Sequence, residues 1–181
     1  MVEMDERELL VGSLKGYLEE LGESGVDELG FAELPASERG WHEVGNPLAR
    51  LLFVMTGAGF AGAAGDLLAK IIQAMGFAGS EVLLLSFPGG HFGAASPARE
   101  ALLARVAAVG PEVVVALGEQ AAQLLLDSGA AIEKLRGRFH DLNGIALLPT
   151  LHPDALLENQ ALKRDVWSDM QQVMRRLAQP R

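Results

Sequence analysis

The sequence contains no cysteine among its 181 residues. That absence excludes disulfide bonds, thiolate catalysis, and zinc or iron–sulfur sites built on cysteine ligands. Long apolar runs are also missing, and none approaches the ~18 residues that a membrane-spanning helix requires. The first ten residues, MVEMDERELL, are acidic and lack the basic start of a secretion signal. We therefore expect a cytoplasmic protein with no membrane partner.

Basic charge is scarce as well. The chain holds 15 Lys and Arg against 24 Asp and Glu, a net charge of -9 that argues against a generic nucleic-acid binder. The imbalance is local, because residues 1–50 hold 12 acids and 4 bases while residues 51–181 hold 12 acids and 11 bases. The larger segment is nearly neutral overall, which leaves room for a basic face.

Four apolar runs and the segments between them indicate the fold class. The runs, which predict buried strands, are 51–55, 82–86, 112–117 and 145–149. Helical patterns follow them at 66–75, 97–109, 118–126 and 160–178. Strands that alternate with helices imply a parallel sheet covered on both faces. We predict an α/β fold: a three-layer α/β/α domain with a central four-stranded parallel sheet.

The remaining segments complete a single domain over residues 1–181. The leucine spacing over 4–21 predicts an acidic amino-terminal helix, and an irregular stretch follows at 26–47. We expect both to pack on the domain. Residues 132–143 are predicted to form a polar connection. The protein is expected to be a monomer.

A glycine-rich turn follows the first apolar run. Gly57, Gly59 and Gly62 match the G-x-G-x-x-G pattern between a strand and a helix, which by itself indicates a dinucleotide site. Such a site needs an acidic residue at the end of the second strand, where Ser86 stands instead, and Glu81 lies at the opposite end. The missing acid favours the alternative that these glycines allow close packing of strand and helix.

His152 follows the last apolar run and is itself followed by Pro153. The carboxyl ends of parallel strands are where open α/β sheets bind ligands. Pro153 stiffens the turn and disfavours immediate continuation into a helix, so the imidazole should have a fixed direction. His152 is therefore the leading candidate for a site residue, and a structural histidine bonded within the protein is the alternative.

Several longer motifs point to one family. They are His152-Pro153, Leu156-Leu157, Asn159 and Lys163-Arg164-Asp165-Val166-Trp167, preceded by Val115-Ala116-Leu117-Gly118, by Ala121-Ala122 and by Lys134-Leu135-Arg136-Gly137-Arg138-Phe139-His140. In this order they resemble the family 4 uracil-DNA glycosylases. The resemblance implies the uracil-DNA glycosylase fold, hydrolysis of the N-glycosidic bond of uracil or another damaged base in DNA repair, and DNA as the partner.

The resemblance also implies roles for residues around the base. His152 would be catalytic, bonding the uracil carbonyl and stabilising the departing base. Phe60, in a segment similar to the family's Phe-x-Gly-x-Ala-Gly run, would stack on the flipped base. Gly57, Gly59 and Ser86 would line the same substrate pocket. For Phe60 the alternative is an aromatic ring buried under the loop.

Further residues are expected to contact DNA. Arg136, Arg138, Lys163 and Arg164 would meet phosphates, as the basic residues of such motifs do. Leu156, with its neighbour Leu157, would lie where the family inserts a side chain into the duplex. The alternatives are a solvated loop for the arginines and a place in the core for the leucines.

The chain departs from the family at its chemical motifs. The family's four iron–sulfur cysteines are all missing, so we expect no cofactor and no metal. The Glu and Pro that position the attacking water are gone, and no carboxylate remains between Arg50 and Asp66. The Asn that reads the uracil edge is replaced by the run around Ser86, with His91 as a possible substitute.

Two functions therefore remain open from the sequence. In the first, the protein still hydrolyses an N-glycosidic bond with His152 and Phe60. In the second, it is a non-catalytic relative that binds nucleic acid, a nucleobase or nucleotide, or a protein. A cofactor-binding α/β protein is a distant third.

Overall fold

The computed structural model describes residues 41–89 and 97–179, which belong to one compact unit. The expected helix at 4–21 and the candidate His91 lie outside these ranges. The packing of the amino-terminal segment on the domain therefore stays a prediction. No helix in the described ranges is both long and apolar enough to cross a membrane.

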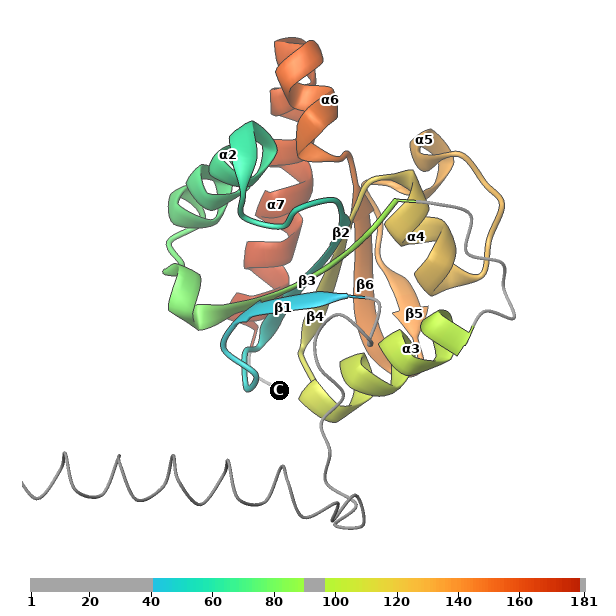
Figure 1. The fold of residues 1–181 in the computed structure, drawn as a ribbon. Helices are drawn as coiled ribbons and strands as arrows, with labels where there is room; N and C mark the ends of the chain where they lie inside the picture. Colours follow the sequence, from blue (N-terminus) through green and yellow to red (C-terminus); the bar gives the residue numbers. More distant parts are fainter. Residues whose placement is uncertain (1–40, 90–96, 180–181) are drawn as a thin grey trace, which may run out of the picture. The chain divides into compact units, whose positions relative to one another are not determined.

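The described part contains one six-stranded sheet (Figure 1). Its strands are β1 His42–Gly45, β2 Leu51–Thr56, β3 Val82–Phe87, β4 Val113–Leu117, β5 His140–Leu142 and β6 Ile145–Thr150. They lie in the order β1-β3-β2-β4-β6-β5. Strands β3, β2, β4 and β6 are parallel, and β1 and β5 pair antiparallel with them at the two edges. The four central strands are those that the apolar runs predict.

The sheet is wider than predicted because two edge strands were missed. Strand β1 lies in the stretch expected to be irregular, and β5 lies in the expected connection at 132–143. Both are short and mix charged with apolar residues, so neither carries an apolar run. Backbone pairing with a buried neighbour holds them instead, for example with His42 opposite Ser86 on β3.

Six helices and two short 3₁₀ turns are described. They are α2 Gly62–Ala74, α3 Pro97–Val109, α4 Glu119–Leu126, α5 Ile132–Leu135, α6 Pro153–Glu158, α7 Lys163–Ala178, η1 Gly79–Glu81 and η2 Gln160–Leu162. Helix α6 differs most from expectation, since a turn was predicted there. Pro153 occupies its first helical position, where the missing N–H has no intrahelical partner to lose.

The sheet is the middle of three layers. Side chains alternate along each central strand, so that Phe53 and Val115 belong to one buried cluster and Leu52 and Val114 to the other. Helices α2 and α7 cover the first face, where Leu156 of α6 joins their buried cluster, and α3, α4 and α5 cover the second (Figure 1). The predicted α/β/α architecture is confirmed.

The strand order creates a switch point between β2 and β4. From β2 the chain passes to β3 on one side, and then to β4 on the other side of β2. Connections that leave adjacent strands in opposite directions open a crevice at their carboxyl ends, which is the usual ligand position in such sheets. Glycines stand at both lips of this crevice: Gly57 follows β2 and Gly118 follows β4.

Candidate functional site

His152 projects from the end of β6 and caps α6. Its ring Nδ1 accepts a hydrogen bond from the Asp154 N–H at 3.1 Å, and its Nε2 lies 3.0 Å from the carbonyl oxygen of Thr56 at the end of β2. The tautomer with the proton on Nε2 satisfies both contacts. The Asp154 carboxylate is also 3.3 Å from Nδ1. The imidazole therefore has the fixed direction that the sequence predicts, but both ring nitrogens are engaged within the protein.

Gly118 makes this placement possible. Its φ of +92° and ψ of 167° belong to a region open essentially to glycine alone. A Cβ at this position would lie 2.9 Å from the Cβ of His152. The Gly118 N–H also donates to the Thr150 carbonyl at 2.8 Å, which holds the ends of β4 and β6 together. The imidazole thus passes over the end of β4 and reaches β2, spanning the switch point.

The structure brings Gly57, Gly59 and Ser86 to the same edge of the sheet. Gly57 has a φ of +99°, donates its N–H to the Phe87 carbonyl at 2.9 Å, and faces open space. Gly59 is packed tightly, since a Cβ there would lie 3.0 Å from Oγ of the buried Ser86. No atom stands close to Gly57 on the side where a side chain would lie, while Gly59 serves close packing.

Phe60 takes a different direction. Its main chain is pressed against α2, where a Cβ on Gly65 would lie 2.2 Å from the Phe60 carbonyl carbon. Its side chain is half-buried and lines a cavity of about 570 Å³ between α2 and η1, together with Asp66 and Phe77. Neither Ser86 nor His152 lines that cavity. The stacking role of Phe60 stays a prediction.

Arg136 is held inside the protein. Its guanidinium lies 2.9 Å from the Asp169 carboxylate on α7, which also accepts a 2.6 Å hydrogen bond from the Thr150 hydroxyl. Asp169 is 2% exposed, and this burial raises its pKa although Thr150 and Arg136 act in the opposite direction. The guanidinium of Arg136 is therefore paired with Asp169 beneath the end of β6. This arginine is less available to a phosphate than the resemblance implies.

The loop after Arg136 is anchored on the same helix. The Gly137 N–H donates to the Pro149 carbonyl at 3.2 Å, and the Gln172 side chain donates to the Gly137 carbonyl at 3.0 Å. Arg138 is exposed and donates to the Lys134 carbonyl at 2.9 Å. Lys163 and Arg164 are also exposed, at the start of α7. These three cations are exposed to solvent, and their contact with DNA stays a prediction.

Of the two leucines in α6, the structure exposes the second. Leu156 is 1% exposed and belongs to the buried cluster under α2 and α7, so the expected contact of Leu156 with DNA does not fit this structure. Leu157 is 45% exposed. The difference arises because α6 begins at Pro153, and consecutive helical residues point about 100° apart.

Sequence reasoning missed three groups at the carboxyl end of the sheet. Two are the Thr56 carbonyl and the Thr150 hydroxyl, which carry no sequence signal beyond their place at strand ends. The third is Asp169, which lies on the apolar stripe of α7 between Val166 and Val173. An acid on an apolar stripe is a recognisable signal, because a buried carboxylate requires partners.

Groups for metal or water chemistry are few at this edge. In the described ranges, no cluster of three His, Asp or Glu side chains is able to hold a metal ion. Residues 51–65, which form β2 and the glycine turn, contain no carboxylate. An iron–sulfur cluster does not fit, since the whole chain lacks its cysteine ligands.

Comparison with known proteins identifies the family. The model of the uracil DNA glycosylase superfamily matches residues 44–171. The type-4 uracil-DNA glycosylase of Thermotoga maritima is 31% identical over 150 residues, an alignment that covers 70% of this chain and 77% of that protein. The family match at residues 44–171 includes the four parallel strands β2, β3, β4 and β6. It also includes the residues at their carboxyl ends, among them His152. The chain belongs to the uracil-DNA glycosylase superfamily, and within it stands close to family 4.

Proposed function

We propose that this protein acts on DNA as a glycosylase that hydrolyses the N-glycosidic bond of uracil or another damaged base. The observation that carries the proposal is the position of His152, held across the switch point by the Thr56 carbonyl and by the glycine at 118. A flipped base at this end of the sheet would approach Gly57, where a side chain would contact no other atom. Membership of a superfamily whose type-4 members are uracil-DNA glycosylases supports it.

The chemistry required is modest. The bond between the sugar C1′ and the base nitrogen breaks, and its electron pair leaves with the base. The oxygen of a water molecule then bonds to C1′, and the proton of that water passes to solvent. An N–H of His152 directed at a base carbonyl oxygen would stabilise the anion that develops. Removal of one such donor typically lowers the rate about 10²–10³-fold.

The hydrogen bond from His152 to Thr56 defines the state from which this chemistry starts. The Nε2 proton is directed at the Thr56 carbonyl oxygen. A base carbonyl oxygen that enters the crevice would compete for the same proton, or share it. Substrate binding thus exchanges one acceptor for another, with little movement of the ring. The bond from the Asp154 N–H would keep the imidazole plane in place meanwhile.

A second function has its own supporting observations. No carboxylate lies in residues 51–65 to position a water, and both nitrogens of His152 are already bonded within the protein. A relative that binds a damaged or unpaired base without cleaving it would need no carboxylate to position a water. It would also need no free nitrogen on His152.

The test is cleavage of uracil-containing single- and double-stranded oligonucleotides by the purified protein. His152→Ala should lower the rate at least about 10²-fold. His140→Ala is the matched control, because the Nε2 of that histidine also lies 2.9 Å from a main-chain carbonyl oxygen, that of Leu135, but on β5. Its rate should match that of the unmodified protein.

The outcomes separate the two functions. Cleavage that depends on His152 and not on His140 supports the glycosylase. Binding of the same oligonucleotides without release of a base overturns the glycosylase and favours the binding relative. Cleavage that survives His152→Ala would remove His152 from the mechanism and with it the observation on which the proposal rests.

A further inference from the structure

A groove between α2 and α7 lies outside the site described above. Its volume is about 250 Å³. Helix α2 contributes Leu67, Lys70, Ile71 and Ala74, a spacing that places all four on one side of the helix. Helix α7 contributes Lys163, Val166 and Trp167, and Leu156 of α6 completes the lining.

The lining combines three kinds of group. Its floor is aliphatic, and the ammonium groups of the exposed Lys70 and Lys163 stand on opposite helices. Trp167 is 36% exposed, whereas Trp41 is 8% exposed. Within residues 41–89 and 97–179 no ion pair engages either lysine, and no carboxylate of those residues lines the groove. The groove thus combines a partly exposed indole with two lysines that no ion pair of the described residues engages.

The groove also lies close to the edge that holds His152. Helix α7 lines the groove with residues of its first two turns, and α6 and η2 connect that start of α7 to His152. Helix α6, which supplies Leu156 to the groove, begins directly after His152 and carries the exposed Leu157. A polymer bound at the imidazole would pass α6 to reach this groove.

We propose that this groove binds single-stranded DNA beside the base held at His152. One base stacks on the indole of Trp167, and the flanking phosphates meet the ammonium groups of Lys70 and Lys163. The inference rests on the proposed action on DNA. Every base offers a face for stacking, so such a site is tolerant of sequence. Lysines that neutralise phosphates add affinity that declines with salt. An acidic peptide is the competing occupant, and the test includes it.

The first measurement is the fluorescence of Trp167 alone. The chain has two tryptophans, so Trp41→Phe leaves Trp167 as the single indole. Titration with a uracil-free oligothymidylate should quench its emission, because the base would stack on the ring. A glutamate-rich peptide of similar charge should leave the emission unchanged. Quenching by the peptide and not by the DNA would overturn the proposal.

The second measurement is the anisotropy of a labelled oligothymidylate, which does not need the Trp41 variant. Trp167→Leu should weaken binding about tenfold, while Trp167→Phe should stay within about threefold because it keeps an aromatic face. The double variant Lys70→Gln/Lys163→Gln should reduce the salt slope of the binding constant by about 1.4, since two phosphates lose their partners. Equal binding by Trp167→Leu and Trp167→Phe would overturn the proposal.

Arg176→Gln is the matched control for charge. It removes one exposed cation from the same helix, about 20 Å along its axis from Lys163. It should leave the salt slope within about 0.3 of that of the unmodified protein. Circular dichroism melts of all variants check that each one folds. A loss of slope as large as that in the double variant would show a general charge effect and overturn the groove.

Cleavage assays with the same variants separate this proposal from the proposed function. Cleavage by the unmodified protein and by Trp167→Leu with the same KM for single strands would keep the glycosylase and overturn the groove. Quenching of Trp167 by DNA with no cleavage by any form would keep the groove and overturn the glycosylase.

Discussion

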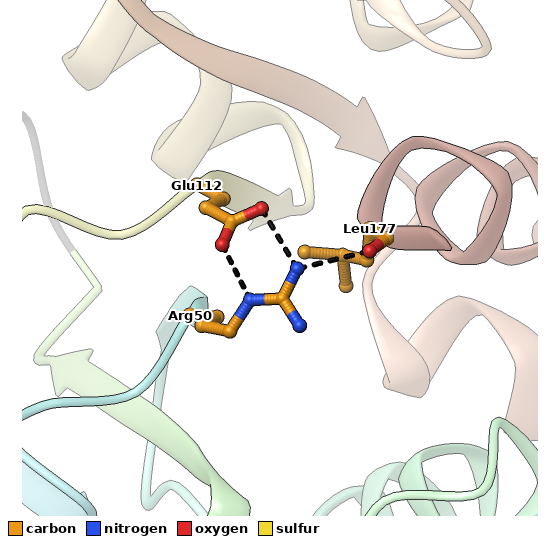
Figure 2. A network of polar contacts seen from close by, with 3 residues as sticks. All are labelled: Arg50, Glu112 and Leu177. Atoms are coloured by element: carbon orange, nitrogen blue, oxygen red, sulfur yellow. Dashed lines mark hydrogen bonds and ion pairs between the residues drawn. The ribbon is translucent and has the colours of Figure 1, made fainter. Parts of the chain in front are cut away.

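The two ends of the central sheet are built in opposite ways. At the amino end, the Arg50 guanidinium forms an ion pair with Glu112 through two hydrogen bonds and donates a third, of 2.9 Å, to the Leu177 carbonyl (Figure 2). These contacts join the starts of β2 and β4 to the end of α7. The hydrogen bond and the charge of Glu112 raise the pKa of Arg50. The Arg50 carbonyl also accepts the N–H groups of Glu112 and Val113. Charge and main chain are satisfied there within the protein.

The carboxyl end has glycines where the amino end has charges. Gly57, Gly59 and Gly118 all have positive φ, and open space adjoins the first of them. The one buried charge described at this end is that of Asp169, beneath β6, and its partner Arg136 is partly exposed. The contrast teaches that the amino end serves cohesion, while the carboxyl end keeps its backbone accessible. Substitutions at the amino end should therefore cost stability alone, whereas substitutions at the carboxyl end should affect stability and function together.

The largest effect is expected from Asp169→Ala. The change leaves the Arg136 guanidinium and the Thr150 hydroxyl without their shared acceptor. Removing one partner of a buried pair costs about 3–5 kcal/mol, and the 23% exposure of Arg136 places this pair at or below the lower bound. Urea unfolding measures the loss. Asp165→Ala, an exposed acid one turn earlier on α7, is the control and should cost under about 0.5 kcal/mol. Equal losses would refute a special role for Asp169.

Gly118→Ala should come next, and it should affect both stability and cleavage. The strained φ and ψ cost about 1–3 kcal/mol, and the new methyl displaces His152 from the Thr56 carbonyl. Gly76→Ala is the control, because Gly76 also has a positive φ of +87° but faces open space away from His152. It should lose stability and keep the cleavage rate. Cleavage that is unchanged in Gly118→Ala would mean that the imidazole position does not matter.

Glu112→Gln tests the amino end and should have a smaller effect. The partner Arg50 is exposed, so salt screens the pair and the loss of stability should be smaller than for either variant above. Thermal melts at low and high salt measure it, and the difference from the unmodified protein should shrink as salt rises. DNA cleavage should not change. A fall in the cleavage rate at equal stability would contradict the separation of the two ends.

The smallest effect concerns pH. The folded pKa of Asp169 lies above its ordinary value of 3.8, chiefly because of burial. The folded protein therefore holds this proton more tightly than the unfolded chain does, and the resulting stability is lost as pH rises through the raised pKa. Compared with Asp169→Asn, which does not titrate, the unmodified protein should lose part of its relative stability as the pH rises from the ordinary pKa of Asp to the raised pKa of Asp169. Urea midpoints at several pH values test it, and an opposite slope would mean that the ion pair with Arg136 dominates.

Local patterns predicted the centre of the molecule well. The four apolar runs predicted the parallel strands because a strand that is buried on both faces is apolar along its whole length. Its own sequence is therefore enough to identify it. The position of His152 at the sheet edge followed from its place after such a run. Strand β1 was missed because pairing with β3, and not its own HEVG sequence, makes it a strand.

Contacts between distant residues were out of reach of the sequence. Arg136 and Asp169 are 33 positions apart, and their pairing depends on how the loop at Gly137 lies on α7. Which of the two leucines, Leu156 or Leu157, is exposed depends on where α6 begins. Pro153 permits the helix to begin there but does not require it. The direction of Phe60 likewise depends on packing against α2.

Helix α7 gives the two ends a common element. Its 16 residues extend about 24 Å; Lys163 and Trp167 lie near its start, Asp169 meets Thr150, and the Leu177 carbonyl accepts from Arg50 near its end. Proteins open to solvent in contiguous cooperative units, and α7 with the strands that it contacts is a candidate for one such unit. A strand of DNA seated on the first turns of α7 should therefore slow amide hydrogen exchange in its last turns and at the start of β2. DNA bound at one end of the molecule would thus be detected at the other end by amide hydrogen exchange alone.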